Sequence, residues 1–187
     1  MTDKLVLVLD VETTGFLKDK KRENYIVEMG IVMVDLETRK KYKIFDEVIK
    51  EEGFSEIHKD AWVFENSDLT FDEVMKKGKP LSDFKDQLQD LFNTFIVTAY
   101  NTDFDLGFLE KAGFTFPYKG PCIMKCATEL YQIKSPWGIK WASVEEAWFY
   151  LFDEPYIEKH RAYDDVLHES EIMLALYSLG VWKYEKI

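Results

Sequence analysis

Apolar residues cluster in the first fifty positions in a way that predicts three β-strands. The uninterrupted run Leu5-Val6-Leu7-Val8-Leu9 is typical of a central strand that is covered on both faces. Apolar-rich runs predict strands near residues 4–11, 25–36 and 41–49, with a turn around Glu37-Thr38-Arg39. We therefore expect an antiparallel meander at the start of the chain.

Beyond the meander, helical spacing alternates with short apolar runs. A helix near residues 82–93 is predicted by five apolar residues at helical spacing: Leu81, Phe84, Leu88, Leu91 and Phe92. Strands are expected near 95–99 and 121–124, and helices near 105–112 and 125–133. Ser143 and Glu146 form a capping box for a helix reaching about Phe152. The last helix should run from about 161 to 179, with Gly180 as its C-terminal cap. This order of elements indicates an α/β fold.

Two acidic residues close the first strand. Asp10 and Glu12 are two positions apart, so on a strand both carboxylates point to the same face. Adjacent carboxylates repel each other and are costly to desolvate, which favours a bound cation. Thr13-Thr14-Gly15 then breaks the strand, and its hydroxyl and amide groups are available to a ligand. The alternative is an acidic strand end that binds nothing.

Two further acidic segments lie downstream and decide between these alternatives. Asn101-Thr102-Asp103-Phe104-Asp105 follows the apolar run Phe95-Ile96-Val97, and His160-Arg161-Ala162-Tyr163-Asp164-Asp165 opens the last helix. At the three segments the sequence resembles the DEDDh family of 3′–5′ exonucleases, in the ribonuclease H-like superfamily that includes proofreading-subunit and ribonuclease T-like domains. The matching signatures are D-x-E-x-T-G, N-x-x-F-D and H-x-A-x-x-D, in this order and across essentially the whole chain.

The resemblance implies a fold and a set of roles. The implied fold is a single ribonuclease H-like exonuclease domain over residues 1–187: a mixed five-stranded sheet, three antiparallel strands followed by parallel strands, flanked by helices. The implied catalytic set comprises four metal-site carboxylates and a general base: Asp10, Glu12, Asp105, Asp165 and His160. The implied substrate-binding residues are Thr13, Thr14, Gly15, Phe16 and Asn101, with Phe16 wedged against the terminal base.

The chemistry of phosphodiester hydrolysis is compatible with this assignment. Two divalent cations about 3.5–4 Å apart can clamp the attacking and leaving oxygens in line. Mg²⁺ and Mn²⁺ favour oxygen ligands, which the four carboxylates offer. A neutral imidazole, with a reference pKa of about 6.5, can accept the proton of the attacking water.

Spacing decides which carboxylates belong to the site. In the resembling pattern the middle aspartate directly follows a phenylalanine, and the last one comes five residues after the histidine. These spacings favour Asp105 over Asp103 and Asp165 over Asp164. The sister subtype carries a tyrosine four residues before its last aspartate, where this chain has Arg161, so the histidine subtype is expected. One departure is Tyr100, where many relatives have a histidine.

Composition narrows the function further. The formal net charge of −11 argues against tight nonspecific binding to long duplexes and favours short contacts to one chain end. We expect hydrolysis of DNA from a free 3′ end, on single strands or frayed ends, with release of nucleoside 5′-monophosphates. The alternatives are an RNA-trimming 3′–5′ exoribonuclease and a non-catalytic, polymerase-associated nucleic-acid-binding subunit.

Cellular context is also predicted. No apolar stretch reaches about 18 residues and the N-terminus lacks a signal-peptide pattern, so a cytoplasmic protein without membrane contact is expected. Cys122 and Cys126 are expected as reduced thiols. Besides nucleic acid, a DNA polymerase or a second copy of the chain is a candidate partner.

Overall fold

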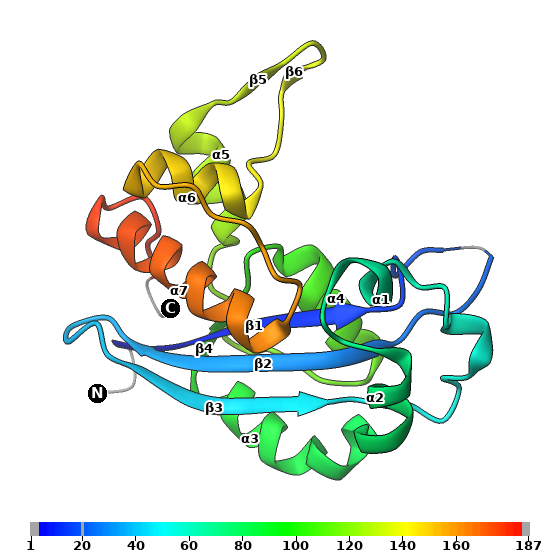
Figure 1. Ribbon diagram of the computed structural model, residues 1–187. Helices are drawn as coiled ribbons and strands as arrows, with labels where there is room; N and C mark the ends of the chain where they lie inside the picture. Colours follow the sequence, from blue (N-terminus) through cyan, green and yellow to red (C-terminus); the bar gives the residue numbers. More distant parts are fainter. Residues whose placement is uncertain (1–3, 20, 185–187) are drawn as a thin grey trace.

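A four-stranded mixed sheet forms the centre of the protein. The structure is a computed structural model and describes residues 4–19 and 21–184. The sheet order is β3-β2-β1-β4, built from Leu5–Thr13 (β1), Ile26–Asp35 (β2), Lys41–Val48 (β3) and Ile96–Thr98 (β4). β1 pairs antiparallel with β2, β2 antiparallel with β3, and β4 parallel to β1 (Figure 1). The predicted meander and the mixed α/β architecture are therefore confirmed.

The expected fifth strand is absent from this sheet in the part of the chain that the structure describes. Residues 121–124 do not form a strand, because helix α5 (Ile123–Tyr131) begins within them. Lys119 forms an isolated parallel bridge with Val97, beside β4. Past this bridge the carbonyl oxygen of Ala99 accepts the N–H of Ile123, the first residue of α5, at 3.3 Å, so the segment enters a helix instead of continuing the ladder.

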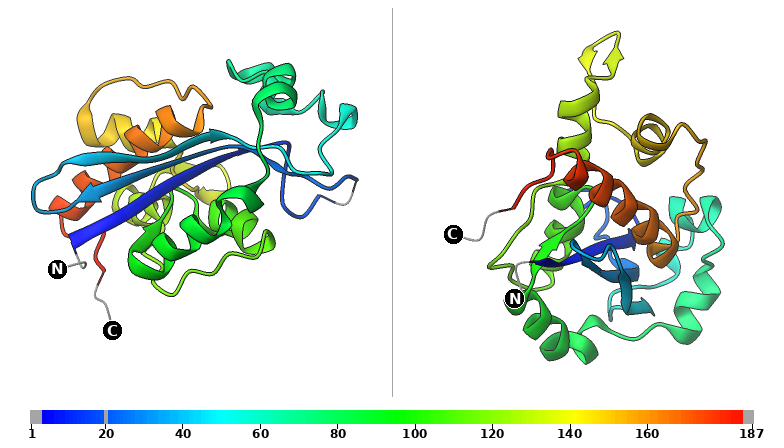
Figure 2. Two further views of the ribbon diagram at one scale, coloured as in Figure 1. Left: turned by 90° about the horizontal axis from the view of Figure 1, so that it is seen from below. Right: turned by 90° about the vertical axis from the view of Figure 1, so that its left-hand side faces the viewer.

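Helices cover both faces of the sheet. On one face pack α3 (Lys85–Thr94) and α4 (Thr102–Lys111), and on the other α5, α6 (Val144–Phe152) and α7 (Ala162–Ser178). Figure 2 shows the sheet edge-on between these two layers. Along β1, Leu7 and Leu9 join the first layer, whereas Val6 and Val8 join the second. By the same alternation, Asp10 and Glu12 point to the side of α7.

Several short elements were not predicted. They are the 3₁₀ turn Glu56–His58 (η2), helices α1 (Trp62–Asn66) and α2 (Phe71–Lys77), and the hairpin of β5 (Lys134–Ser135) and β6 (Gly138–Ile139), whereas the 3₁₀ turn Leu81–Phe84 (η3) falls within the start of the helix expected near 82–93. Each is too short to show a clear period in the sequence. The predicted capping box of α6 is confirmed, with Ser143 Oγ accepting from the N–H of Glu146. No described helix is long and apolar enough to cross a bilayer.

The absence of a side chain at Gly30 lets α7 approach the sheet closely. Gly30 on β2 is the register partner of Asp10. A Cβ atom at Gly30 would lie 2.5 Å from the carbonyl oxygen of Ala162 and 2.7 Å from the backbone nitrogen of Tyr163. Any larger residue would therefore push away the first turn of α7. The close contact brings that turn next to the carboxylates of β1.

Candidate active site

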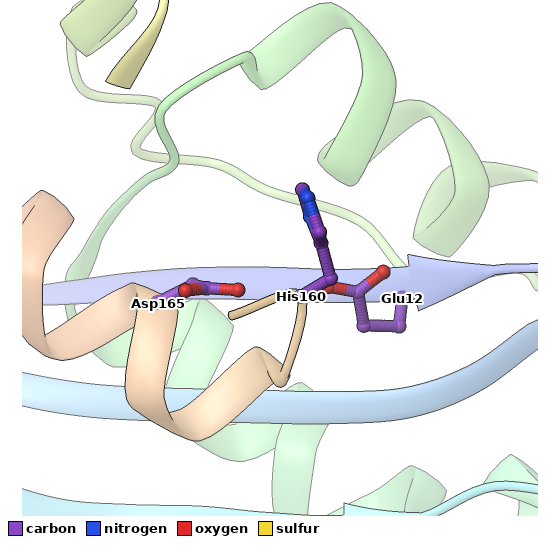
Figure 3. A group of neighbouring side chains, drawn as sticks. All are labelled: Glu12, His160 and Asp165. Atoms are coloured by element: carbon purple, nitrogen blue, oxygen red, sulfur yellow. The ribbon is translucent and has the colours of Figure 1, made fainter. Parts of the chain in front are cut away.

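Acidic side chains from four parts of the chain converge at the end of β1. They line a cleft of about 360 Å³ together with the imidazole of His160. The acidic residues lining it are Asp10 and Glu12 from β1, Asp105 from α4, Glu158 from the loop before α7, and Glu169 from α7. Asp165 completes the group, because ligand atoms of Glu12, His160 and Asp165 all lie within 4.8 Å of one another (Figure 3). The structure thus brings together the five residues predicted as catalytic.

Asp165 fixes the loop that carries His160. Its Oδ1 accepts hydrogen bonds from the Tyr156 hydroxyl at 2.9 Å and from the backbone N–H of Lys159 at 3.2 Å. Its Oδ2 accepts the N–H of Arg161 at 2.9 Å. His160 itself adopts a left-handed backbone conformation, with φ of 54°. The last aspartate therefore holds the histidine loop in place, and it lies beside Glu12 in the first turn of α7.

A partly buried ion pair anchors the start of α7 to β2. The Arg161 guanidinium donates from Nη2 to Glu28 Oε1 at 2.6 Å and from Nε to both Glu28 oxygens, at 3.0 and 3.1 Å. The N–H of Ala162 donates to Glu28 Oε2 at 2.9 Å. Glu28 is only 2% exposed. The sequence analysis used Arg161 only to distinguish the histidine subtype from the tyrosine subtype. It gave Glu28 no role.

Burial and mutual repulsion raise the pKa values of the carboxyl groups in the cluster. Burial, followed by repulsion from Asp165, raises the pKa of Glu12 to about 8. Burial raises the pKa of Asp105 to about 7, although backbone hydrogen bonds oppose the shift. Burial and then the charge of Asp165 raise the pKa of Glu158 to about 7. The pKa of Asp10 is raised well above its ordinary value by burial, then by Glu169.

The donor set fits divalent cations. Oδ2 of Asp10 is buried and has no hydrogen-bond partner among the described residues. Carboxylate oxygens are the ligands that Mg²⁺ and Mn²⁺ prefer, and a cation would relieve both the repulsion and the missing partner. Among the described residues no lysine or arginine lines the cleft, and the nearby Arg161 is engaged by Glu28.

The two competing aspartates lie outside the cluster. The Asp103 side chain is 75% exposed and pairs with Lys125 at 2.7 Å. The Asp164 side chain is 45% exposed and lies 3.6 Å from Lys159. By contrast, Asp105 is 3% exposed. The placement of these side chains is therefore compatible with the choice made from spacing.

A second, apolar cleft adjoins the carboxylates. It has a volume of about 450 Å³ and is lined by Val11, Glu12, Thr13, Gly15, Phe16, Trp62 and Phe104. Phe16 is 75% exposed and Trp62 57% exposed, so both rings are available for stacking. Trp62 also contacts the His160 ring edge-on, at 4.7 Å between centroids. Trp62 was not predicted, because the five-residue helix α1 gives no sequence signal.

Of the predicted substrate-binding residues, Thr14 is not brought to either cleft. It is 2% exposed, and its hydroxyl donates to Asn24 Oδ1 at 3.1 Å and accepts the N–H of Tyr25 at 3.0 Å. A Cβ atom on Gly15 would lie 2.8 Å from the same Asn24 oxygen. Thr14 and Asn24 therefore support the turn from behind. Asn101 lines the carboxylate cleft.

Tyr100, at the position where many members of the resembling family have a histidine, anchors a neighbouring segment by a hydrogen bond. Its hydroxyl donates to the carbonyl oxygen of Ala142 at 2.9 Å, and the side chain is 6% exposed. It therefore anchors the segment at the rim of the carboxylate cleft. His168 stacks on Tyr156, at 4.3 Å between centroids, and its Nδ1 lies 2.8 Å from the carbonyl oxygen of Asp164.

No protein-family model and no curated protein sequence matches this chain. Solved nuclease structures do match its fold. The nuclease domain of 3'hExo, a DEDDh family member bound to rAMP, is 15% identical, with a TM-score of 0.71 over 99% of this chain and 98% of that domain. E. coli Exonuclease I in complex with a dA16 oligonucleotide is 16% identical, with a TM-score of 0.62 over 94% of this chain and 41% of that one. S. pombe Pop2p, in its Mg²⁺- and Mn²⁺-bound form, is 15% identical, with a TM-score of 0.63 over 92% of this chain and 82% of that one.

These matches establish the fold of the chain. The chain shares its fold with these nuclease structures, one of which is the nuclease domain of a DEDDh family member, in line with the resemblance seen in the sequence. Some matched proteins are longer than this chain. The chain spans 63% of a full-length 3'-exonuclease and 65% of cell-death related nuclease 4 (CRN-4).

The raised pKa values predict how stability changes with pH in the absence of metal. The folded-state pKa of Asp105, about 7, lies above the unfolded value near 3.8, so the folded state binds more protons between these pH values. Its contribution to stability is complete below the unfolded pKa and is lost as the pH rises through 7. We expect metal-free Asp105→Asn to gain at least about 1 kcal/mol over wild type between pH 5 and 8.

Denaturant unfolding of both proteins in a chelator, at several pH values, measures this difference. Asp103→Asn is the matched control, because its side chain is exposed and paired with Lys125. A stability difference between Asp105→Asn and wild type that stays constant from pH 5 to 8 would contradict the prediction.

Proposed function

We propose that the protein is a metal-dependent 3′–5′ exonuclease. It hydrolyses DNA from the 3′ end, on single strands or frayed ends, and releases nucleoside 5′-monophosphates. The observation that carries the proposal is the meeting of two clefts at Glu12. One cleft is lined with carboxylates and His160, and the other with exposed aromatic rings. A nucleotide seated on the aromatic rings would place its phosphate beside the carboxylates.

The carboxylates would hold the metal ions of this reaction. Asp10, Glu12, Asp105 and Asp165 offer the oxygen ligands, and the orphaned Oδ2 of Asp10 supports a bound cation there. Two divalent cations would lower the pKa of the attacking water and neutralise charge on the phosphate and the leaving oxygen.

His160 is suited to accept the proton of the attacking water. One of its ring nitrogens lies within 4.8 Å of a carboxylate oxygen of Glu12 and of Asp165, and the loop that carries it is fixed by three hydrogen bonds to Asp165. Trp62 packs against the same ring, at 4.7 Å between centroids. The imidazole is thus held at the carboxylate cleft.

The aromatic cleft would bind the terminal nucleotide. Phe16 and Trp62 offer faces on which a base can stack, and stacking does not depend on base identity. Among the lining side chains only Glu12 and Thr13 are polar, and the Thr13 hydroxyl donates to the carbonyl oxygen of Gly15 at 2.8 Å. A 2′-hydroxyl would find few partners, which supports a DNA substrate.

The same argument limits the expected preference for DNA. A pocket without dedicated hydrogen-bond partners rejects an added hydroxyl by at most about 100-fold. RNA trimming is therefore the alternative activity that the site allows. A DNA polymerase or a second copy of the chain as partner, and a cytoplasmic location, stay predictions.

The proposed activity predicts a specific product pattern. A 5′-labelled single strand should shorten as a ladder from its 3′ end when Mg²⁺ or Mn²⁺ is added, and a matched RNA should be degraded more slowly. Asp105→Asn should abolish the ladder, because it removes a buried ligand charge, while the exposed Asp103→Asn should retain most activity. Gel analysis of labelled oligonucleotides measures both. Internal cleavage of a circular single strand would refute the exonuclease assignment.

The assignment of His160 as base predicts a pH-dependent loss of rate. His160→Ala should lower kcat by about 10²–10⁴-fold, the usual contribution of a general base, with little change in metal affinity. The wild-type rate should rise with pH and reach a plateau, because only the neutral imidazole accepts a proton. That dependence should weaken in the variant. Rates across pH 5–9 test this, and an unchanged profile in His160→Ala would leave the imidazole without a chemical role.

A further inference from the structure

Glu169 is an additional carboxylate in the cleft, beyond the four metal-site residues that the sequence segments predict. It lies four residues after Asp165 on α7, so both side chains lie on one face of the helix. Glu169 is 2% exposed and lines the cleft together with Asp10. Its pKa is raised by burial first and then by the charge of Asp105.

The buried side chain of Glu169 lacks the partners that a structural role would provide. Among the described residues, the buried side-chain atoms without a hydrogen-bond partner are Asp10 Oδ2 and Glu169 Oε2. Both belong to this one cluster. Glu28 offers a direct comparison, because it is also 2% exposed but its oxygens are satisfied by Arg161 and Ala162. A buried carboxylate oxygen without a donor is unfavourable unless a cation is bound.

We propose that Glu169 is a ligand of the divalent cation bound by Asp10, so that five carboxylates rather than four hold the metal ions. The inference rests on the proposed function, since it assigns a residue to the metal site of that activity. It also explains why the two unpartnered oxygens belong to residues that line the same cleft.

Metal binding tests this assignment without any need for nuclease activity. Mn²⁺ is titrated into metal-free wild type, Glu169→Gln and the control Glu171→Gln, and binding is followed by calorimetry and by the Mn²⁺ spin-resonance signal. Glu171 is on the same helix, but it pairs with Lys41 at the surface. Glu169→Gln should weaken Mn²⁺ binding at least about tenfold, and Glu171→Gln should bind as wild type does.

The outcomes separate the inference from the proposed function. Equal Mn²⁺ affinity in Glu169→Gln and wild type overturns the inference, whether or not DNA is cleaved. A wild type that binds Mn²⁺ through Glu169 but cleaves no nucleic acid overturns only the proposed function. Should Glu169→Gln fail to fold, Glu169→Asp retains the charge with a shorter reach, and its affinity should lie below that of wild type.

A second inference concerns the β5–β6 hairpin, which projects from the body of the protein (Figures 1 and 2). Its tip residue Trp137 is 95% exposed, and Ile139 and Trp141 are 55% and 61% exposed. Lys134 pairs with Ile139 across the hairpin, so both side chains lie on one face. Trp141 follows two residues after Ile139, just beyond the end of β6.

The hairpin and its flanking residues, 130–144, are called the arm here. The arm is continuous with the candidate active site and differs from it in charge. Trp141 also lines the carboxylate cleft. Residues 130–144 contain two lysines and no acidic residue, in a chain of net charge −11. Lys140 is held by Glu146 at 2.6 Å, whereas Lys134 has no ion pair among the described residues. Exposed aromatic rings beside an unpaired cation are the combination that binds single-stranded nucleic acid.

We infer that the arm binds the part of a single strand that lies 5′ of the end being cleaved. The bases stack on Trp137 and Trp141, and Lys134 contacts a phosphate. This inference also rests on the proposed function, because it extends the path of the same substrate away from the cleft.

Substrates of different length test the arm. Trp137→Ala should raise the KM for a dT20 oligonucleotide about tenfold, without changing kcat or the hydrolysis of a dinucleotide too short to reach the arm. Tyr42→Ala is the matched control, because Tyr42 is a 48% exposed aromatic residue on β3. Fluorescence anisotropy of labelled dT20 in a chelator reports binding alone.

An unchanged dT20 affinity in Trp137→Ala overturns the inference. Loss of self-association in sedimentation with dT20 affinity intact would also overturn it, and would assign the arm to a contact between copies of the chain. Binding of dT20 that depends on Trp137, without any cleavage, supports the arm and counts against the proposed function alone.

Discussion

The ion pair between Arg161 and Glu28 is the interaction on which the candidate site depends. It joins β2 to the N-cap of α7, with the Glu28 carboxylate buried and the Arg161 side chain 28% exposed. Removing one partner of such a pair typically costs about 3–5 kcal/mol, because the other charge stays buried. Gly30 makes the same junction possible sterically, since the first turn of α7 rests against its Cα. With this junction in place, Asp165 faces the cleft and holds the loop of His160.

The sequence predicts the parts of this arrangement whose signals are local. Strand alternation places Asp10 and Glu12 on one face, and the spacing of the last segment separates Asp165 from Asp164. The parts that depend on contacts between distant segments could not be predicted. In the sequence Glu28 looks like any other strand residue, and only the fold places Arg161 2.6 Å from it. Likewise, Trp62 contacts His160 only because α1 folds over the His160 loop.

Three further differences have local causes that are visible only with hindsight. Helix α5 begins at Ile123, directly after the bridge beside β4, where a fifth strand was expected. Thr14 turns inward because Asn24 offers its hydroxyl a partner. Glu169 carried a weak signal, since a glutamate four residues after Asp165 shares its helix face. The spacing shows which face Glu169 occupies, but only the packing of α7 on β1 shows that this face is buried.

An acidic chain could bind the negatively charged nucleic acid of the proposed function if cations first neutralise the carboxylates of the cleft. The cleft concentrates carboxylates whose raised pKa values show that they are poorly stabilised as anions. Without cations, each carboxylate that ionises would repel an approaching phosphate. Under the proposed function, cations would therefore enter before or together with the substrate. In the proposed arrangement, stacking on exposed aromatic rings holds the strand without adding charge, so affinity and metal-dependent chemistry are supplied by different parts of the surface.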